Sequence, residues 1–308
     1  MKHSQLYLRA CRAGVRWSAL ALLPLLTGCY RHTRVLEKPL PASVVQNATS
    51  DQLIHLVNQQ YDAIHSLRAT VSIQASVGGA SKGQETDYTS VRGFILLRKP
   101  EMLRVLGLLP VLETRAFDMS SNGDHFLLLI PPQGKAYEGA GTLTHPSKNT
   151  LENLRPFVFL DSLLIRKVEP TEMVYVTNTT RLIRETRSKR LREEPDYDLG
   201  ILRRMPGTNE LEPVRVIHFS RVDLLPFQQD IYDGKGTLET RAIYSQYRTF
   251  GTMQFPTEIT IERPLDLYKI HLSVQKLAVN IPLEDDQFHL KVPSSYRVQN
   301  LDIKKTVQ

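Results

Sequence analysis

Two distant segments of the chain alternate apolar and polar residues with a period of two. The first runs from Arg68 to Val77 and the second from Tyr268 to Gln275. In a β-strand successive side chains point to opposite faces, so each segment predicts a strand with one apolar and one polar face. Strands of this kind belong to antiparallel sheets that cover only one of their faces.

Further segments repeat this strand pattern. They are Tyr88–Arg98, Met102–Leu106, Val111–Met119, His125–Ile130 and Glu258–Glu262. The run Ser121–Asp124 predicts a turn between two of them. After Val274 the alternation changes phase, because the next apolar residues are Leu277, Val279 and Ile281. A β-bulge produces such a phase change.

Two segments carry helical spacing instead. From a candidate N-cap at Ser50, apolar residues recur every three or four positions as far as Leu67. Between Lys148 and Ile165 a shorter apolar pattern predicts a second helix that Pro156 kinks or restarts. No internal repeat and no second linker are visible. We therefore expect a mainly β fold with a helical lid (α+β): a single curved antiparallel sheet whose apolar face is covered or surrounds a cavity.

The first 29 residues have the layout of a secretory signal. Four cations precede an apolar run of ten residues, Trp17 to Leu26, which is too short to span a bilayer. Leu26-Thr27-Gly28-Cys29 resembles the lipobox of bacterial lipoproteins, although an ordinary signal peptide could contain the same letters. The resemblance implies a cleaved signal peptide over 1–28, with diacylglycerol and an N-acyl chain on Cys29. Tyr30 follows, where the family's inner-membrane retention signal has Asp, so the resemblance implies the outer membrane.

Cysteine content and net charge limit the classes of protein to which the chain can belong. The chain has two cysteines, and Cys11 would leave with the signal, so we expect no intramolecular disulfide in the mature protein. The net charge of +7 includes four signal cations, and without them it is about +3. This charge does not support nucleic-acid binding. We expect residues 29–48, which contain two prolines and no clear period, to be a lipidated tether.

The run VLGLLPVL, from Val105 to Leu112, has no charge. It is either a buried strand or an exposed hairpin tip that contacts an apolar partner. Leaving several leucines in water is unfavourable, because burial of one leucine contributes roughly 1.5–3 kcal/mol. We favour the tip and assign to a membrane-contacting loop Leu106, Leu108, Leu109, Val111 and Leu112.

The order of the elements resembles the LolA/LolB-like lipoprotein-carrier fold over roughly residues 50–300. The local matches include LRATVSIQ, RGFILLRKPEMLRV, IYDGKGTLETRAIYSQY and FPTEITIERP. The resemblance implies an incomplete β-barrel around an apolar cavity that receives acyl chains, within a lipid-binding domain over 49–303 and a tail over 304–308. Candidate cavity-lining residues are Val71, Ile73, Phe94, Leu96, Ile259, Ile261, Tyr268, Ile270 and Leu272. The lipobox and the apolar run both point to LolB-type outer-membrane lipoproteins.

Catalytic signatures are absent from the sequence. It holds no HExxH, no GxSxG and no cysteine pair in the mature part. The DGKGT run at Asp233–Thr237 predicts a hairpin turn, and Asp285-Asp286 a solvated turn rather than a cation site. We expect no enzyme activity, no metal site and no cofactor other than the lipid on Cys29.

One basic cluster lies between residues 181 and 192 in a stretch longer than the family pattern. It is either a solvated face or a surface for anionic lipid headgroups, and the headgroup candidates are Arg184, Arg187, Lys189 and Arg190. A cation near an anionic surface contributes about 1 kcal/mol.

Taken together, these features predict a monomeric outer-membrane lipoprotein that faces the periplasm. It would bind acyl chains and aid the reception or insertion of lipoproteins. Its expected partners are outer-membrane lipid, lipoprotein acyl chains and a periplasmic LolA-like carrier. The alternative is a non-catalytic envelope scaffold or assembly lipoprotein with the same fold and no transported cargo.

Overall fold

A computed structural model describes residues 34, 36–41, 44–79, 82–141, 153–185 and 189–302. The predicted signal peptide and Cys29 lie outside the described residues. The chain divides into two units, residues 1–40 with 184–192, and residues 41–183 with 193–308. Within the described residues no helix has the length and apolar character to cross a membrane.

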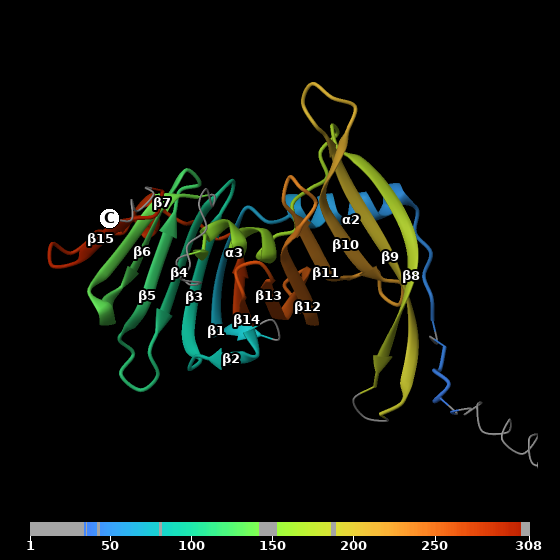
Figure 1. Ribbon diagram of the computed structural model, residues 1–308, viewed down its shortest axis with the longest axis horizontal. Helices are drawn as coiled ribbons and strands as arrows, with labels where there is room; N and C mark the ends of the chain where they lie inside the picture. The colour runs from blue at the N-terminus through green and yellow to red at the C-terminus, as the bar shows by residue number, and fades with distance from the viewer. Residues whose placement is uncertain are drawn as a thin grey trace, which may run out of the picture. The chain divides into compact units, whose positions relative to one another are not determined.

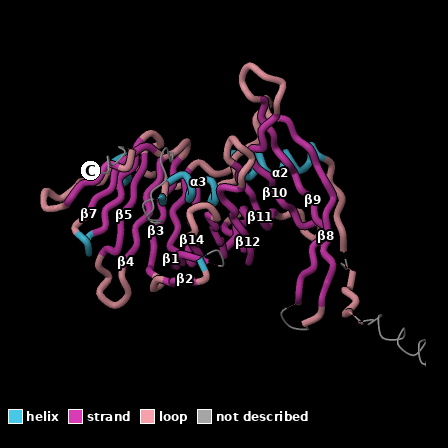
Figure 2. Tube along the Cα trace, viewed as in Figure 1, coloured by secondary structure: helices cyan, strands magenta, loops and turns pink. Residues whose placement is uncertain are grey.

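Strands form most of the described chain (Figures 1 and 2). The two α-helices are α2 (Ser50–Asp62) and α3 (Pro156–Leu163), and short 3₁₀ turns are η3 (Pro131–Gln133) and η5 (Asp285–Phe288). The strands of the first half are β1 (Ser66–Gly79), β2 (Gln84–Asp87), β3 (Val91–Arg98), β4 (Met102–Leu108), β5 (Arg115–Ser121), β6 (His125–Ile130) and β7 (Lys135–Ala140). Those of the second half are β8 (Met173–Arg184), β9 (Leu191–Arg204), β10 (Leu211–Ser220), β11 (Pro226–Tyr232), β12 (Leu238–Phe250), β13 (Met253–Arg263), β14 (Tyr268–Val279) and β15 (Arg297–Asn300).

These strands form a single open sheet, which confirms the predicted fold class. Its order is β15-β7-β6-β5-β4-β3-β1-β14-β13-β12-β11-β10-β9-β8, with β2 paired to β1 alone. Neighbouring strands such as β1 and β3 or β3 and β4 pair antiparallel, whereas β15 pairs parallel with β7, so the sheet is mixed. β1 joins the two halves of the sheet by pairing with both β3 and β14. The sheet is curved. The predicted bulge is present, because the β1–β14 register shifts between Thr70 and Val71, opposite Val274–Lys276.

One face of the sheet carries the core. Val71 pairs with Val274, Ile73 with Leu272, and Leu272 in turn with Ile259, so these side chains point the same way. Helix α3 packs Val158, Phe159 and other apolar residues into this cluster. A second cluster lies farther along the same unit, where Leu53 and Val57 of α2 pack with apolar residues of β9 and β10. Figure 1 shows both helices running across the strands.

The structure refines the predicted helix boundaries. Thr49, not Ser50, is the N-cap of α2, and its side chain and that of Gln52 bond reciprocally to each other's backbone N–H. Pro156 begins α3 rather than kinking a longer helix, because the first position of a helix needs no N–H donor. Part of the expected tether is also held in place, since Gln46 N donates to Arg221 O at 2.7 Å.

Candidate functional site

The apolar face beneath α3 is the first component of the candidate site. Most of the predicted cavity-lining residues reach it and are almost fully buried: Val71, Ile73, Ile259, Ile261, Tyr268, Ile270 and Leu272. The alternation of β3 corrects the other two. Ile95 and Leu97 point into the core, whereas Phe94 and Leu96 lie half-buried on the opposite face, because Gly93 is the residue paired with Val71.

Side chains from α3 fill the space above this face. Beneath the end of α3 a cavity of about 20 Å³ remains, lined by Ile64, Leu163, Tyr244 and their neighbours. This volume holds about one water-sized group. An acyl chain can therefore enter the interior only if α3 moves away from the sheet.

A larger groove of about 450 Å³ lies beside α2. Its walls are mainly apolar and come from α2, the β10–β11 turn and the β12–β13 turn: Leu56, Val57, Phe219, Leu224, Leu225, Pro226 and Met253. Gln60 and Ile165 line both this groove and the small cavity beneath α3. The groove thus lies against the interior at the end of α3, and its mainly apolar lining suits an aliphatic chain.

Polar contacts hold α3 at both ends. Before the helix, Asn153 Nδ2 donates to Asp266 Oδ1 at 2.9 Å, and Arg263 Nε donates to Asp266 Oδ2 at 2.9 Å. At its end, Gln229 Nε2 donates to Asp161 O at 3.0 Å. These residues apart from Asp161 are buried, so the bonds fix the helix on the sheet.

The β4–β5 hairpin presents the most exposed apolar side chains near the predicted tip. Val111 is 96% and Leu112 75% exposed. Leu109 N donates to Thr114 O at 2.8 Å, so the turn begins after Leu109. Val111 has φ +71°, which is unfavourable for a β-branched residue. Its exposure means that no packing in the described structure explains this strain.

The predicted membrane loop therefore divides into two parts. Leu106 and Leu108 lie in β4 and are half-buried, and Leu109 is half-buried where the turn begins. Only Val111 and Leu112 form the exposed tip. Gly107 is a strand residue that pairs with Gly93 and with Phe117. The Phe117 ring covers it, so an added Cβ would lie 2.4 Å from Phe117 Cε1.

Residues 184–192 of the basic segment belong to the smaller unit. Arg184 Nη1 lies 3.5 Å from Glu37 Oε2, and the Arg184 guanidinium also bonds to Lys189 O. Leu40 N donates to Leu191 O at 2.9 Å, so residues 37–40 run beside this segment. Lys189 and Arg190 are exposed, and Arg187 lies outside the described residues.

A charged cluster that sequence reasoning missed lies on the sheet face opposite the core. His218 Nδ1 is 2.7 Å from Asp198 Oδ1, and Arg241 donates two 2.8 Å bonds to Asp230. Burial acts to lower the pKa of His218, but Asp198 and Asp230 outweigh it and raise the pKa to about 9. Burial acts to raise the pKa of Asp230, but its bonds to Arg241 and His218 lower it to about 2. The strand register brings these side chains together, and no sequence spacing reveals that.

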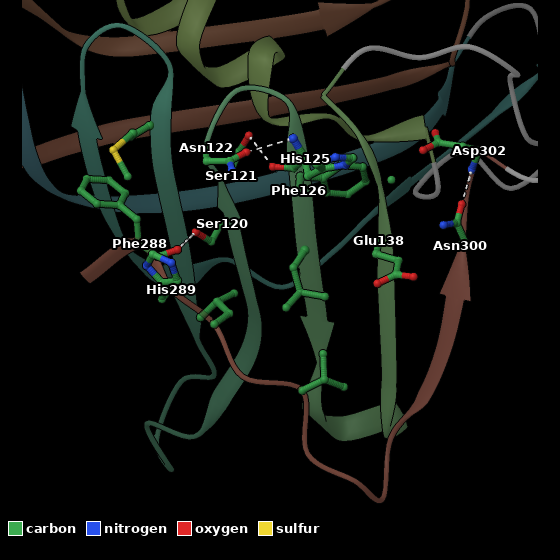
Figure 3. A pocket seen from close by; sticks show the side chains of 15 residues that line it. Ser120, Ser121, Asn122, His125, Phe126, Glu138, Phe288, His289, Asn300 and Asp302 are labelled. Atoms are coloured by element: carbon green, nitrogen blue, oxygen red, sulfur yellow. Dashed lines mark hydrogen bonds between the residues drawn. The ribbon is translucent and has the colours of Figure 1, made fainter. Parts of the chain in front are cut away.

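A pocket of about 500 Å³ lies between β5–β7 and the C-terminal arm (Figure 3). Several of its polar groups hold local structure. Asn122 Oδ1 accepts from His125 N at 3.0 Å, Asn300 Oδ1 accepts from Asp302 N at 2.9 Å, and Ser120 donates to Phe288 O. Among the described residues no group of three or more His, Cys, Asp or Glu side chains is placed to hold a metal ion.

Comparisons with known proteins give structural likenesses alone. No family model matches the sequence, and no curated protein matches it. A LolA superfamily protein from Nitrosomonas europaea aligns at 13% identity over 79% of this chain and 99% of its own, with a TM-score of 0.47. A DUF1329 family protein from Desulfovibrio piger aligns at 13% identity over 78% of this chain and 95% of its own, with a TM-score of 0.46.

A third solved structure is a proposed outer membrane lipoprotein-sorting protein domain from Vibrio parahaemolyticus. It aligns at 11% identity over 78% of this chain and 94% of its own, with a TM-score of 0.42. All three TM-scores are below 0.5, so the fold assignment rests on the strand order and register described above.

Proposed function

We propose that this protein is an outer-membrane lipoprotein, anchored through Cys29, that binds acyl chains and aids the reception or insertion of lipoproteins. It acts by binding and without catalysis, and it needs no cofactor beyond its own lipid. The observation that carries this proposal is the apolar groove beside α2, which shares Gln60 and Ile165 with the cavity beneath α3.

Burial of apolar surface supplies the binding energy in this proposal. An acyl chain lying in the groove contributes about 0.8 kcal/mol for each CH₂ that it buries. Displacement of α3 would expose further apolar surface of the sheet for a second or longer chain. The bonds at Asp266 and Gln229 oppose that displacement, so cargo binding and helix movement are linked.

Membrane delivery is assigned to the hairpin tip. Val111 and Leu112 project at one end of the sheet. Arg92 and Arg115, which pair with Leu108 at the base of this hairpin, are exposed cations, and Arg115 also lies 3.4 Å from Asp118. Arg92 also pairs with Glu113 at 3.3 Å. Apolar side chains next to cations fit an anionic membrane interface. The proposed partners are outer-membrane lipid, lipoprotein acyl chains and a LolA-like periplasmic carrier, with the protein itself monomeric in the periplasm.

The alternative function, an envelope scaffold without cargo, is favoured by one observation. The space under α3 is nearly full in this structure, with about 20 Å³ left. A filled core needs no ligand for its stability. The two functions differ in whether the groove takes up an acyl chain.

A fluorescent fatty-acyl probe separates these functions. We expect the Cys29→Ser protein, which lacks its own lipid, to bind the probe. Met253→Glu places a charge in the groove wall, and we expect it to weaken binding at least tenfold. Thr249→Glu is the matched control, because Thr249 is exposed on β12 outside the groove. Equal binding by both variants and the parent would contradict the groove as the acyl site.

A further inference from the structure

The pocket of about 500 Å³ between β5–β7 and the C-terminal arm, residues 288–302, has no part in the proposed acyl binding (Figure 3). It shares no lining residue with the groove beside α2. Leu127 of β6 pairs with Glu138 of β7, so both side chains point to one face of the sheet. Their chain neighbours Leu128 and Tyr137 belong to the core. Leu127 and Glu138 therefore line the pocket from the face opposite the core.

Hydrogen bonds hold the C-terminal arm on the sheet at both ends of the pocket. Arg104 Nη1 donates to Gln287 O at 2.7 Å just before the arm, and Leu301 N donates to Glu138 O at 2.8 Å near its end. Phe288, the first residue of the arm, is 5% exposed. The pocket is therefore a preformed part of the fold, as ligand sites usually are.

Two carboxylates line the pocket, those of Glu138 and Asp302, whereas no Lys or Arg side chain lines it. The half-buried Glu138 carboxylate has no hydrogen bond or ion pair with any described residue. Asp302 Oδ2 accepts from Ala140 N at 2.6 Å, and its buried Oδ1 has no hydrogen-bond partner in the described part of the chain. Asp302 also interacts electrostatically with the buried Arg155, which balances part of its charge. The unbalanced charge of the pocket thus lies at Glu138.

The arm supplies a further acceptor. His289 Nδ1 lies 2.8 Å from Asp285 O. A carbonyl oxygen only accepts, so Nδ1 carries the proton, and Nε2 of the neutral ring is an acceptor. Asn122 and Asn300 use their side-chain oxygens for local bonds, so their amide N–H groups add donors without charge. A cation with N–H donors therefore suits this pocket better than an anion does.

We propose that this pocket binds an alkylammonium group, of a free amine or of a lysine side chain on a polypeptide. The ammonium donates to Glu138 in a charge-assisted hydrogen bond. Leu127, Leu290 and Val292 give the pocket an apolar surface, on which the methylene stem lies as lysine stems do on other apolar surfaces. This site goes beyond acyl binding and uses none of the groove residues.

Two amines and their uncharged counterparts test the site. Cadaverine, a free diamine, is compared with pentanediol, and lysine blocked at both backbone ends is compared with the same compound acetylated on Nζ. Ligand-observed NMR titration of the Cys29→Ser protein at low ionic strength measures binding. We expect Glu138→Gln to weaken binding of both amines about tenfold, the effect of one charge-assisted hydrogen bond, and to leave the uncharged compounds unchanged. Glu85→Gln is the matched control, because it makes the same change of net charge at an exposed residue of β2.

The possible results separate this site from the proposed function. Binding of only one of the two amines supports the site and identifies its source as a free amine or a polypeptide lysine. Equal binding of the amines and their uncharged counterparts by the parent protein overturns the site. An equal loss in Glu138→Gln and Glu85→Gln does so too, because it indicates an effect of net charge alone. The fluorescent acyl probe should bind Glu138→Gln and its parent equally, so failure of the amine site leaves acyl binding intact.

Discussion

Replacement of Val111 by asparagine should make the protein more stable and its membrane binding weaker. Asparagine tolerates positive φ far better than a β-branched residue does. Val111 at φ +71° carries backbone strain, and strain of this kind costs about 1–3 kcal/mol. With relief of part of it, we expect the free energy of unfolding to rise by about 1 kcal/mol and Tm by about 2 °C.

The same substitution has an unfavourable effect on membrane binding. Val111 and Leu112 are 96% and 75% exposed, and full burial of such side chains contributes roughly 1.5–3 kcal/mol each. Scaled by exposure, insertion of both into lipid contributes about 2.5–5 kcal/mol. Val111→Asn removes more than half of this, so the partition coefficient should fall roughly 10- to 100-fold.

Co-sedimentation with phosphatidylethanolamine–phosphatidylglycerol vesicles measures the partition of the Cys29→Ser protein, and urea unfolding measures its stability. Val111→Ala is the matched control, because it loses apolar surface but relieves only the strain of the β-branch, and it should lose binding with a smaller gain in stability than Val111→Asn. Leu211→Ser, on a strand distant from β4 in the sheet order, should leave vesicle binding unchanged. A Val111→Asn protein that gains stability but keeps full vesicle binding would refute insertion of the tip.

Three further predictions follow from the described contacts. Leu265 lies in the β13–β14 turn at the same end of the sheet as the tip and is 60% exposed. Leu265→Ser should therefore lower vesicle binding, by a smaller factor than Val111→Asn does. Unchanged vesicle binding would exclude this turn from the membrane interface. Asp266→Ala should destabilise the fold by about 3–5 kcal/mol in urea, because it leaves the buried Arg263 charge without this partner; a loss below 1 kcal/mol would contradict that. The pKa of His218 is raised to about 9 in the folded protein, whereas its unfolded value is about 6.5. Protonated His218 therefore stabilises the fold fully below about pH 6.5, and this contribution is lost as the pH rises through about 9. His218→Gln should therefore flatten the urea stability profile between about pH 6.5 and 9, and an unchanged slope would contradict the charged cluster.

Much of the sheet follows from the sequence because alternation reports which face of a strand is buried. β1 and β14 were predictable in type and in face for this reason, and the phase change after Val274 located the bulge. Alternation does not identify the buried face of a strand where several apolar residues follow one another. Across the four apolar residues from Phe94 to Leu97 the prediction that Phe94 and Leu96 face the cavity was wrong, and pairing with β1 places Ile95 and Leu97 on the core face.

Other features depend on tertiary contacts that no local pattern carries. All residues of β2 are exposed, so the strand has no apolar face to mark it. Of the predicted membrane loop only Val111 and Leu112 form the exposed tip, because β4 continues to Leu108 in pairing with β3.

Acyl binding is the central claim, and native mass spectrometry of the Cys29→Ser protein tests it most directly. The protein is purified without detergent from cells that supply their own lipids. We predict a population heavier than the apoprotein by the mass of bound acyl lipid, which Met253→Glu reduces and Thr249→Glu does not. A single ligand-free mass, unchanged after incubation with a long-chain fatty acid, would contradict acyl binding and favour the scaffold.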